Sequence, residues 1–144
     1  MQQFKWLILS LSIATAANAA DVTIEISNRQ SPNSSIICGL FESKQGFPTD
    51  NKKAAILVNA SFENDKTSCK FSDLKATRFA IAVMEDLNGN GRLDTTFVGF
   101  PKKPWGVSNN APAHAFSPPT FDEAAVEKPS EGEIKSLSIK LIQP

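Results

Sequence analysis

Apolar residues recur at every second position in several short stretches, and this spacing limits what the chain can fold into. The clearest alternation covers residues 22–26 and 137–141, where isoleucine, valine and leucine alternate with polar residues. A period of two is typical of a β-strand with one face in a core. Residues 36–41 and 54–58 are denser in apolar residues, as expected for central strands. Further strands are expected at 67–71 and 79–84, with a short one at 95–100.

Six or seven short strands in one small domain favour an all-β fold. We predict an antiparallel β-sandwich of about seven strands, immunoglobulin-like or transthyretin-like, with one helical turn at 121–125. Residues 20–144 are enough for a single core and too few for two domains. The predicted core includes Ile24, Leu40, Phe79, Ile81, Val83 and Ile139.

Residues 1–19 have the three parts of a secretory signal peptide. Lys5 supplies the positive start, residues 6–13 the apolar centre, and Ala17-Asn18-Ala19 a cleavage site. We therefore expect a periplasmic or secreted protein, cleaved near Ala19, with no transmembrane segment in the mature chain. Removal of Lys5 leaves 14 basic and 15 acidic residues, a balance that does not indicate nucleic acid or an anionic membrane as partner.

The two cysteines, Cys38 and Cys69, both follow the signal. An even pair in an exported chain predicts one disulfide bond between two strands. The spacing is not that of a C-x-x-C redox motif, so we expect the bond to be structural.

Asp86–Asp94 follows the apolar run 79–84 and resembles the first half of a calcium-binding loop. Oxygen-bearing side chains recur at nearly alternate positions, and Gly91 stands sixth, where such loops turn sharply. Phe97 stands twelfth, in place of a bidentate glutamate. With only two carboxylates, we expect weak calcium binding, of the order of 10⁻⁴–10⁻³ M. The predicted ligands are Asp86, Asn88, Asn90, the Arg92 carbonyl and Asp94.

Alternatively, the same loop is an Asn-Gly turn that is ordered without a metal ion. Asn88-Gly89 and Asn90-Gly91 both favour hairpin turns, and Asn and Asp can hydrogen-bond their own backbone. A bound calcium ion would need more oxygens than the loop offers, so water or the next loop would complete its shell.

Residues 101–121 contain five prolines and no periodic pattern. A segment of this kind in a compact domain is either a functional loop or a flexible one. We expect an ordered loop beside Asp86–Asp94, anchored by Trp105 and Phe116; alternatively, both rings cap the core. The residues named as candidate surface contacts or shell ligands are Trp105, Asn109, Asn110 and Phe116.

Several motifs together resemble a bacterial exported family, domain of unknown function 2141 (DUF2141). Its pattern is His-Asp-x-Asn-x-Asn-Gly-x-Leu-Asp, then Gly-x-Pro-Lys-x-x-x-Gly-x-Ser-Asn-Asn, then Pro-Pro-Ser-Phe. This chain matches at 86–94, 99–110 and 118–121, with Glu85 in place of the usual histidine and Trp105 where Tyr or Phe is common. The resemblance implies the fold and export, and brings no established activity.

We expect a non-catalytic exported protein whose calcium-stabilised loop presents a surface to an envelope protein or a saccharide. One alternative is a structural envelope accessory without metal. Another is a hydrolase that uses Glu85, Asp86 or Asp94 with His114. Carboxylates between Asn-Gly turns should be solvated, which gives little reason for a pKa near neutrality and disfavours the hydrolase.

Overall fold

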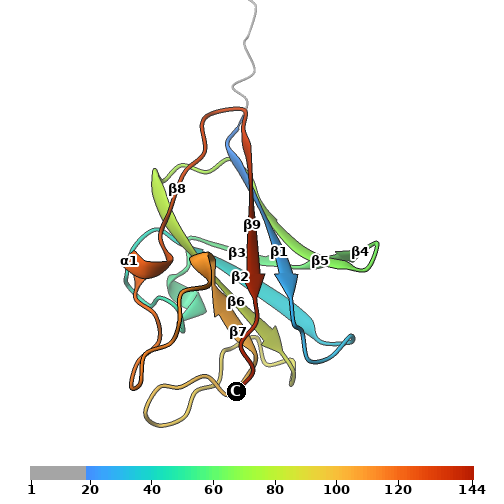
Figure 1. Cartoon of the computed structure of the whole chain (residues 1–144), viewed down its shortest axis with the longest axis vertical. Coiled ribbons are helices and arrows are strands. Elements are labelled where there is room, and N and C mark those ends of the chain that lie inside the picture. Colours follow the sequence, from blue (N-terminus) through green and yellow to red (C-terminus); the bar gives the residue numbers. More distant parts are fainter. Residues whose placement is uncertain (1–18) are drawn as a thin grey trace, which may run out of the picture.

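The computed structural model describes residues 19–144 and consists of two facing β-sheets (Figure 1). The first sheet has the order β4-β5-β1-β9, and the second β3-β2-β6-β7, with β8 also paired to β6. The strands are β1 (Asp21–Ser27), β2 (Ser35–Phe41), β3 (Ile56–Asn59), β4 (Ser61–Glu63), β5 (Lys66–Phe71), β6 (Arg78–Asp86), β7 (Trp105–Val107), β8 (Val126–Glu127) and β9 (Ile134–Lys140). The short helices are η1 (Asn51–Lys53), η2 (Ser108–Asn110) and α1 (Phe121–Ala124). All but the last residue of the predicted signal peptide lies outside the described residues.

This architecture confirms the predicted all-β sandwich, with three differences. β9 pairs with β1 in parallel rather than antiparallel; the chain between them crosses to the second sheet and returns, which a hairpin connection could not do. β3 is an edge strand rather than a central one. Residues 95–100 form a loop closed by a single bridge between Thr95 and Pro101. The short strands β4, β7 and β8 were not predicted, and since 95–100 is not a strand, the total is nine rather than seven.

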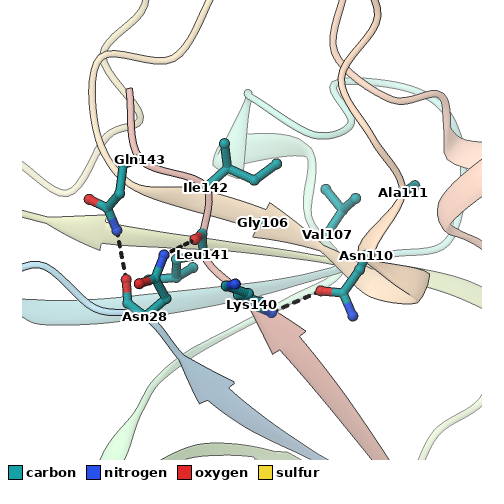
Figure 2. A pocket seen from close by; sticks show the side chains of 9 residues that line it. All are labelled: Asn28, Gly106, Val107, Asn110, Ala111, Lys140, Leu141, Ile142 and Gln143. Atoms are coloured by element: carbon teal, nitrogen blue, oxygen red, sulfur yellow. Dashed lines mark hydrogen bonds between the residues drawn. The ribbon is translucent and has the colours of Figure 1, made fainter.

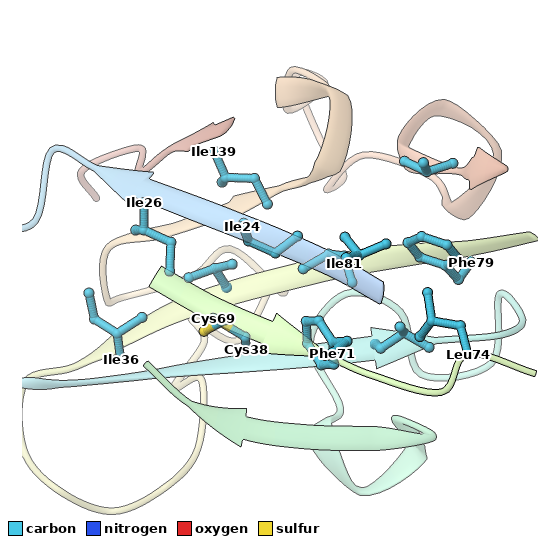
Figure 3. Packing of buried hydrophobic residues seen from close by; sticks show 14 of the residues in the cluster. Ile24, Ile26, Ile36, Cys38, Cys69, Phe71, Leu74, Phe79, Ile81 and Ile139 are labelled. Carbon is cyan, nitrogen blue, oxygen red and sulfur yellow. A yellow bond between two sulfur atoms is a disulfide. The ribbon is translucent and has the colours of Figure 1, made fainter. Parts of the chain in front are cut away.

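Buried apolar side chains fill the space between the sheets (Figure 3). All six residues of the predicted core are at most 2% exposed. Cys38 of β2 and Cys69 of β5 form the predicted disulfide bond, which joins one sheet to the other within this core. Linking residues 31 positions apart stabilises the fold by about 3–4 kcal/mol on the chain-entropy model.

A second apolar cluster covers the other face of β6. Phe79, Ile81 and Val83 belong to the core between the sheets, whereas Ala80 and Ala82 belong to the second cluster. β6 is therefore buried on both faces, which explains why its sequence is apolar throughout rather than alternating. The second cluster also contains Phe41, Trp105, Val107, Ala111, Phe121 and Ala124.

The proline-rich segment 101–121 contributes several residues to this second cluster and so covers the outer face of β6. Trp105 is buried in the second cluster, so it anchors the segment as expected, and its assignment as a surface contact is wrong. Phe116 is 90% exposed, so it neither anchors the segment nor caps the core. Ser108 is buried and bonds across elements: its hydroxyl accepts from the Ile81 N–H and donates to the Ala124 carbonyl.

Gly106 lets β7 lie close to β9. A Cβ atom on this residue would come within 2.7 Å of Ile139 Cγ2 and 3.1 Å of the Lys140 carbonyl oxygen. Trp105 also exchanges two backbone hydrogen bonds with Ile142, just after β9. The last residues of the chain thus extend the second sheet beyond β7.

Candidate functional site

The candidate site begins where β6 ends, at Asp86. The Asp86 carboxylate is buried and accepts a hydrogen bond of 2.8 Å from the Gly91 N–H. Asn90 accepts one of 3.0 Å from the Arg92 N–H. Gly91 has a φ of 72°, a left-handed conformation that glycine adopts without strain. These bonds curl residues 86–94 into a compact loop, so part of its order comes from the side chain–backbone bonds expected of an Asn-Gly turn.

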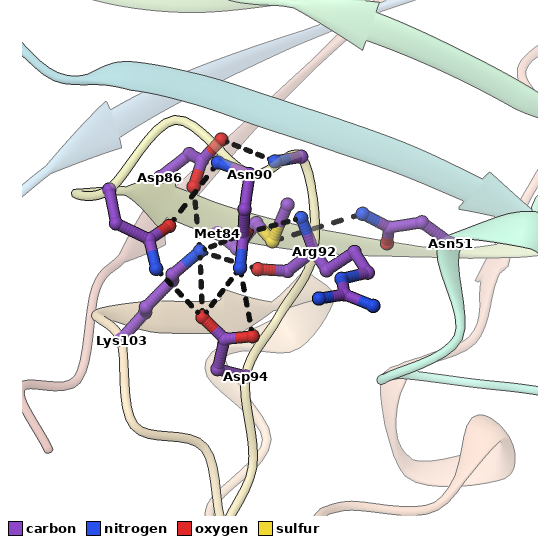
Figure 4. Close-up of polar contacts among 9 residues, drawn as sticks. Asn51, Met84, Asp86, Asn90, Arg92, Asp94 and Lys103 are labelled. Atoms are coloured by element: carbon purple, nitrogen blue, oxygen red, sulfur yellow. Dashed lines mark hydrogen bonds and ion pairs between the residues drawn. The ribbon is translucent and has the colours of Figure 1, made fainter.

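A lysine ammonium occupies the centre of this loop (Figure 4). Lys103 Nζ lies 2.6 Å from Asp86 Oδ1, 2.6 Å from Asn90 Oδ1 and 2.6 Å from the Arg92 carbonyl oxygen. It lies 3.3 Å from Asp94 Oδ2. The Lys103 side chain is only 4% exposed. Its three N–H donors therefore each have an oxygen partner, as a buried ammonium requires.

Four of the five predicted calcium ligands thus contact one positive charge. The fifth, Asn88, points its amide instead at Asp94, with Nδ2 3.1 Å from Oδ2. Within residues 19–144, no three His, Cys, Asp or Glu side chains gather in a metal-binding arrangement. The donor set here is two carboxylates, an amide oxygen and a carbonyl, a mixture of hard oxygens that suits calcium as well as an ammonium.

The two carboxylates of the loop are held in the ionised form. Burial tends to raise the pKa of Asp86, but hydrogen bonds from Lys103 and the Gly91 N–H outweigh it, so the pKa is lowered. Hydrogen bonds from the Asn90 and Asn88 amides lower the pKa of Asp94, with a smaller contribution from Lys103. The expectation that both carboxylates are solvated is wrong for Asp86, because Lys103 and the loop backbone cover it.

Glu85, the neighbour of Asp86 on β6, is fully buried in a different environment. Its carboxylate accepts hydrogen bonds from the backbone N–H groups of Gln30 at 2.6 Å and Ser31 at 2.7 Å, and from the Ser34 hydroxyl. It therefore fixes the loop between β1 and β2, and all its described partners are neutral. The motif resemblance led us to expect a histidine at this position, and the glutamate found here instead makes a structural contact.

The remaining predicted polar residues lie away from the loop. The Asn109 amide donates to the carbonyls of Glu123 and Ala125, and Asn110 bonds to the backbone of Ser138 and Lys140 on β9. These bonds join both amides to backbone outside the 86–94 loop, and their part in a metal shell stays a prediction. His114 Nε2 lies 2.9 Å from Glu123 Oε1.

The His114 pair has an electrostatic consequence at the start of α1. Glu123 also accepts from the N–H and hydroxyl of Thr120 in a capping box. The hydrogen bond from His114, followed by those from Thr120, lowers the pKa of Glu123 to about 2. Among the described residues, no hydrogen bond joins His114 to Glu85, Asp86 or Asp94, so the groups named for a hydrolase do not form one connected set.

A hollow lies at the edge of β7 that faces away from β6, beside β9 (Figure 2). It has a volume of about 490 Å³ and is lined by Asn28, Asn110 and residues 106–107 and 140–143, with Ala111. Its amide side chains bond to the protein's own backbone: Asn28 to Leu141, Gln143 to Asn28, and Asn110 to Lys140. These bonds hold the end of the chain against β1 and β7.

Lys103 is the residue that sequence reasoning missed. It lies in the proline-rich segment that we expected beside the loop, between Pro101 and the buried Pro104. The available signal was a lysine in that segment and a loop with two carboxylates and no nearby basic partner other than Arg92. The spacing of residues does not predict that the Lys103 side chain points into the loop.

Comparison with known proteins places the chain in a family. Residues 24–135 match the model of an uncharacterized protein family conserved in bacteria, DUF2141. Because the match covers most of the chain, the protein belongs to this family, as its motifs suggested. No curated protein and no solved structure gives a significant match. None of the helices within residues 19–144 has the length and apolar character needed to cross a membrane.

Proposed function

We propose that this chain is an exported, non-catalytic β-sandwich protein in which the 86–94 loop is organised around a cation and presents a binding surface. Lys103 holds the cation position, and calcium enters by exchange with its ammonium. The observation that carries the proposal is the placement of Lys103 Nζ among Asp86, Asn90, the Arg92 carbonyl and Asp94.

Charge balance favours such an exchange. Asp86 and Asp94 together carry two negative charges, and Lys103 supplies one positive charge. A calcium ion would neutralise both carboxylates and could take the same oxygens as ligands. Lysine has a flexible stem whose ammonium can turn toward water, and the Asp94 side chain, 32% exposed, marks the open side of the loop.

The same features predict weak binding. Calcium takes about six to eight oxygens, so water must complete its shell. The ion must also displace an ammonium with satisfied hydrogen bonds, which costs part of the binding free energy. A dissociation constant of the order of 10⁻⁴–10⁻³ M, as in extracellular calcium modules, is expected.

Calcium titration of the wild-type protein tests this proposal. Because calcium would bind the folded state alone, a few millimolar should raise the melting temperature. Magnesium should raise it less, since it demands a tighter octahedral site. Asp94→Asn should abolish the rise. It is a better test than Asp86→Ala, because Asp86 is buried against Lys103 and its removal would also unsettle the fold. No heat of binding and no change on chelation would refute the calcium exchange.

That negative result would favour the second candidate, an envelope accessory protein without metal. Lys103 already satisfies the loop oxygens, and this specific observation supports the metal-free form.

The hydrolase stays a third alternative, tested by screening glycoside, ester and peptide substrates. Against it, the carboxylates of Asp86 and Asp94 have lowered pKa values, opposite to what a general acid at neutral pH needs.

Export is tested separately. A protein isolated from the periplasm or medium should begin at or near Ala20, as intact mass would show, because the predicted cleavage site ends at Ala19. A cytoplasmic protein that retains residues 1–19 would contradict this part of the proposal.

A further inference from the structure

A second cleft lies on the outer side of the same loop. It has a volume of about 320 Å³, within the range of small-molecule sites. One wall is Gly91–Leu93 of the loop, the opposite wall is the segment 49–52, which contains the first two residues of η1, and Leu57 of β3 completes the lining. The cleft therefore forms where the 86–94 loop faces the edge of the second sheet.

The apolar part of this cleft consists of Leu57 and Leu93. Leu57 is 50% exposed, on the edge strand β3. It is not part of either buried cluster. An exposed leucine alone needs no explanation, but here it lies beside Leu93 in a concave surface. That surface can cover an apolar group of a ligand.

The charged part consists of Lys52 from η1 and Arg92 from the loop. Within the described part of the chain, neither side chain forms an ion pair or a side-chain hydrogen bond. Figure 4 shows the Arg92 guanidinium extending away from the Lys103 centre, toward the segment that carries Asn51. The one carboxylate in the lining, Asp50, caps η1 by accepting from the Lys52 N–H. Two cations against one carboxylate leave a net positive charge.

We infer that this cleft binds a small organic anion: a carboxylate or sulfonate attached to an apolar body. The anionic group would pair with Arg92, whose planar guanidinium suits such oxygens, and with Lys52. The apolar body would lie on Leu57 and Leu93. The inference rests on the proposed function in one respect: the Arg92 carbonyl accepts from Lys103, so the cation at the loop centre positions this wall.

Two dyes that differ by one sulfonate test the inference. 8-Anilinonaphthalene-1-sulfonate has an aromatic body and a sulfonate, and N-phenyl-1-naphthylamine has the same body without it. We expect saturable one-to-one binding of the sulfonate, measured by fluorescence and calorimetry, and binding of the neutral dye at least about tenfold weaker. A factor of ten corresponds to loss of one charge-assisted hydrogen bond.

Variants locate the binding. Arg92→Ala and Lys52→Ala should each weaken sulfonate binding by about tenfold. Lys102→Ala is the matched control, since Lys102 is exposed and outside the cleft lining, and should leave it unchanged. Equal binding of the two dyes, or equal effects of all three variants, would overturn the inference.

The calcium proposal can fail or succeed independently of this result. Arg92 offers calcium only its backbone carbonyl, so Arg92→Ala should keep the calcium response while weakening sulfonate binding by about tenfold. A wild-type protein that binds the sulfonate but shows no calcium response would refute the exchange at Lys103. It would still support anion binding in the cleft.

Discussion

Glu85 and Asp86 are adjacent on β6, and both are buried, yet the protein stabilises their carboxylates in different ways. Glu85 accepts from two backbone N–H groups and a hydroxyl, all neutral, in the loop between β1 and β2. Asp86 faces the ammonium of Lys103 and one backbone N–H. Neutral donors make a fixed structural contact, whereas an ammonium is a whole charge that another cation can replace. The difference gives Glu85 a structural role and supports the proposed cation exchange at Asp86.

Lys103→Met should produce the largest loss of stability. It removes the ammonium and leaves Asp86 buried without its partner, and breaking a buried pair in this way costs about 3–5 kcal/mol. Denaturant unfolding measures the change. Lys102→Met, one position away and exposed, should stay within about 0.5 kcal/mol of wild type. Equal effects of the two variants would mean that Lys103 has no special role.

Glu85→Ala should cost less, and calcium should not narrow its difference in stability from wild type, because the 86–94 loop is intact in this variant. It leaves the Gln30 and Ser31 N–H groups without their acceptor, a penalty of at most about 1–3 kcal/mol for each. Water reduces this penalty, because Gln30 is exposed and Ser31 is half-buried. The same unfolding experiment, repeated with millimolar calcium, compares the two carboxylates directly. Calcium should narrow the difference in unfolding free energy between Lys103→Met and wild type, and should leave the difference between Glu85→Ala and wild type unchanged. Narrowing of both differences would contradict separate roles for the two carboxylates.

Glu123→Gln should have the smallest effect, and it should depend on pH. The folded pKa of Glu123 is about 2, below its ordinary value of 4.5. Its ionised form therefore stabilises the fold above about pH 4.5, and this contribution is lost as the pH falls toward 2. Melting curves should show a difference between wild type and variant that shrinks over this interval. Glu131→Gln, in an exposed turn, is the control; a constant difference would contradict the prediction.

The sequence was most informative where burial and local spacing agree. The apolar run at 79–84 predicted β6, and the alternation at 22–26 and 137–141 predicted β1 and β9. The paired cysteines predicted the bond between the sheets. Local patterns of this kind predict the positions of strands because each strand must bury its own apolar face. These patterns do not say which strand pairs with which, so the parallel pairing of β1 with β9 could not be inferred from them.

The candidate site shows the same division. The loop spacing predicted which oxygens converge, and four of the five predicted ligands surround one charge. It did not predict that the charge belongs to Lys103, because long-range contacts position this lysine. Trp105 is buried in the second cluster, and the Glu85 N–H donates to the Pro104 carbonyl. For the same reason, the exposed position of Phe116 could not be distinguished from the buried position of Trp105 by residue type.

The central claim is that the Lys103 ammonium and calcium compete for one position. Calorimetric titration of calcium into wild type and Lys103→Met tests it most directly, with Lys102→Met as control. Removing the competing ammonium should tighten calcium binding by at least about tenfold, equivalent to about 1.4 kcal/mol, while the control matches wild type. Equal calcium affinity in all three proteins, or no binding to Lys103→Met, would contradict the claim.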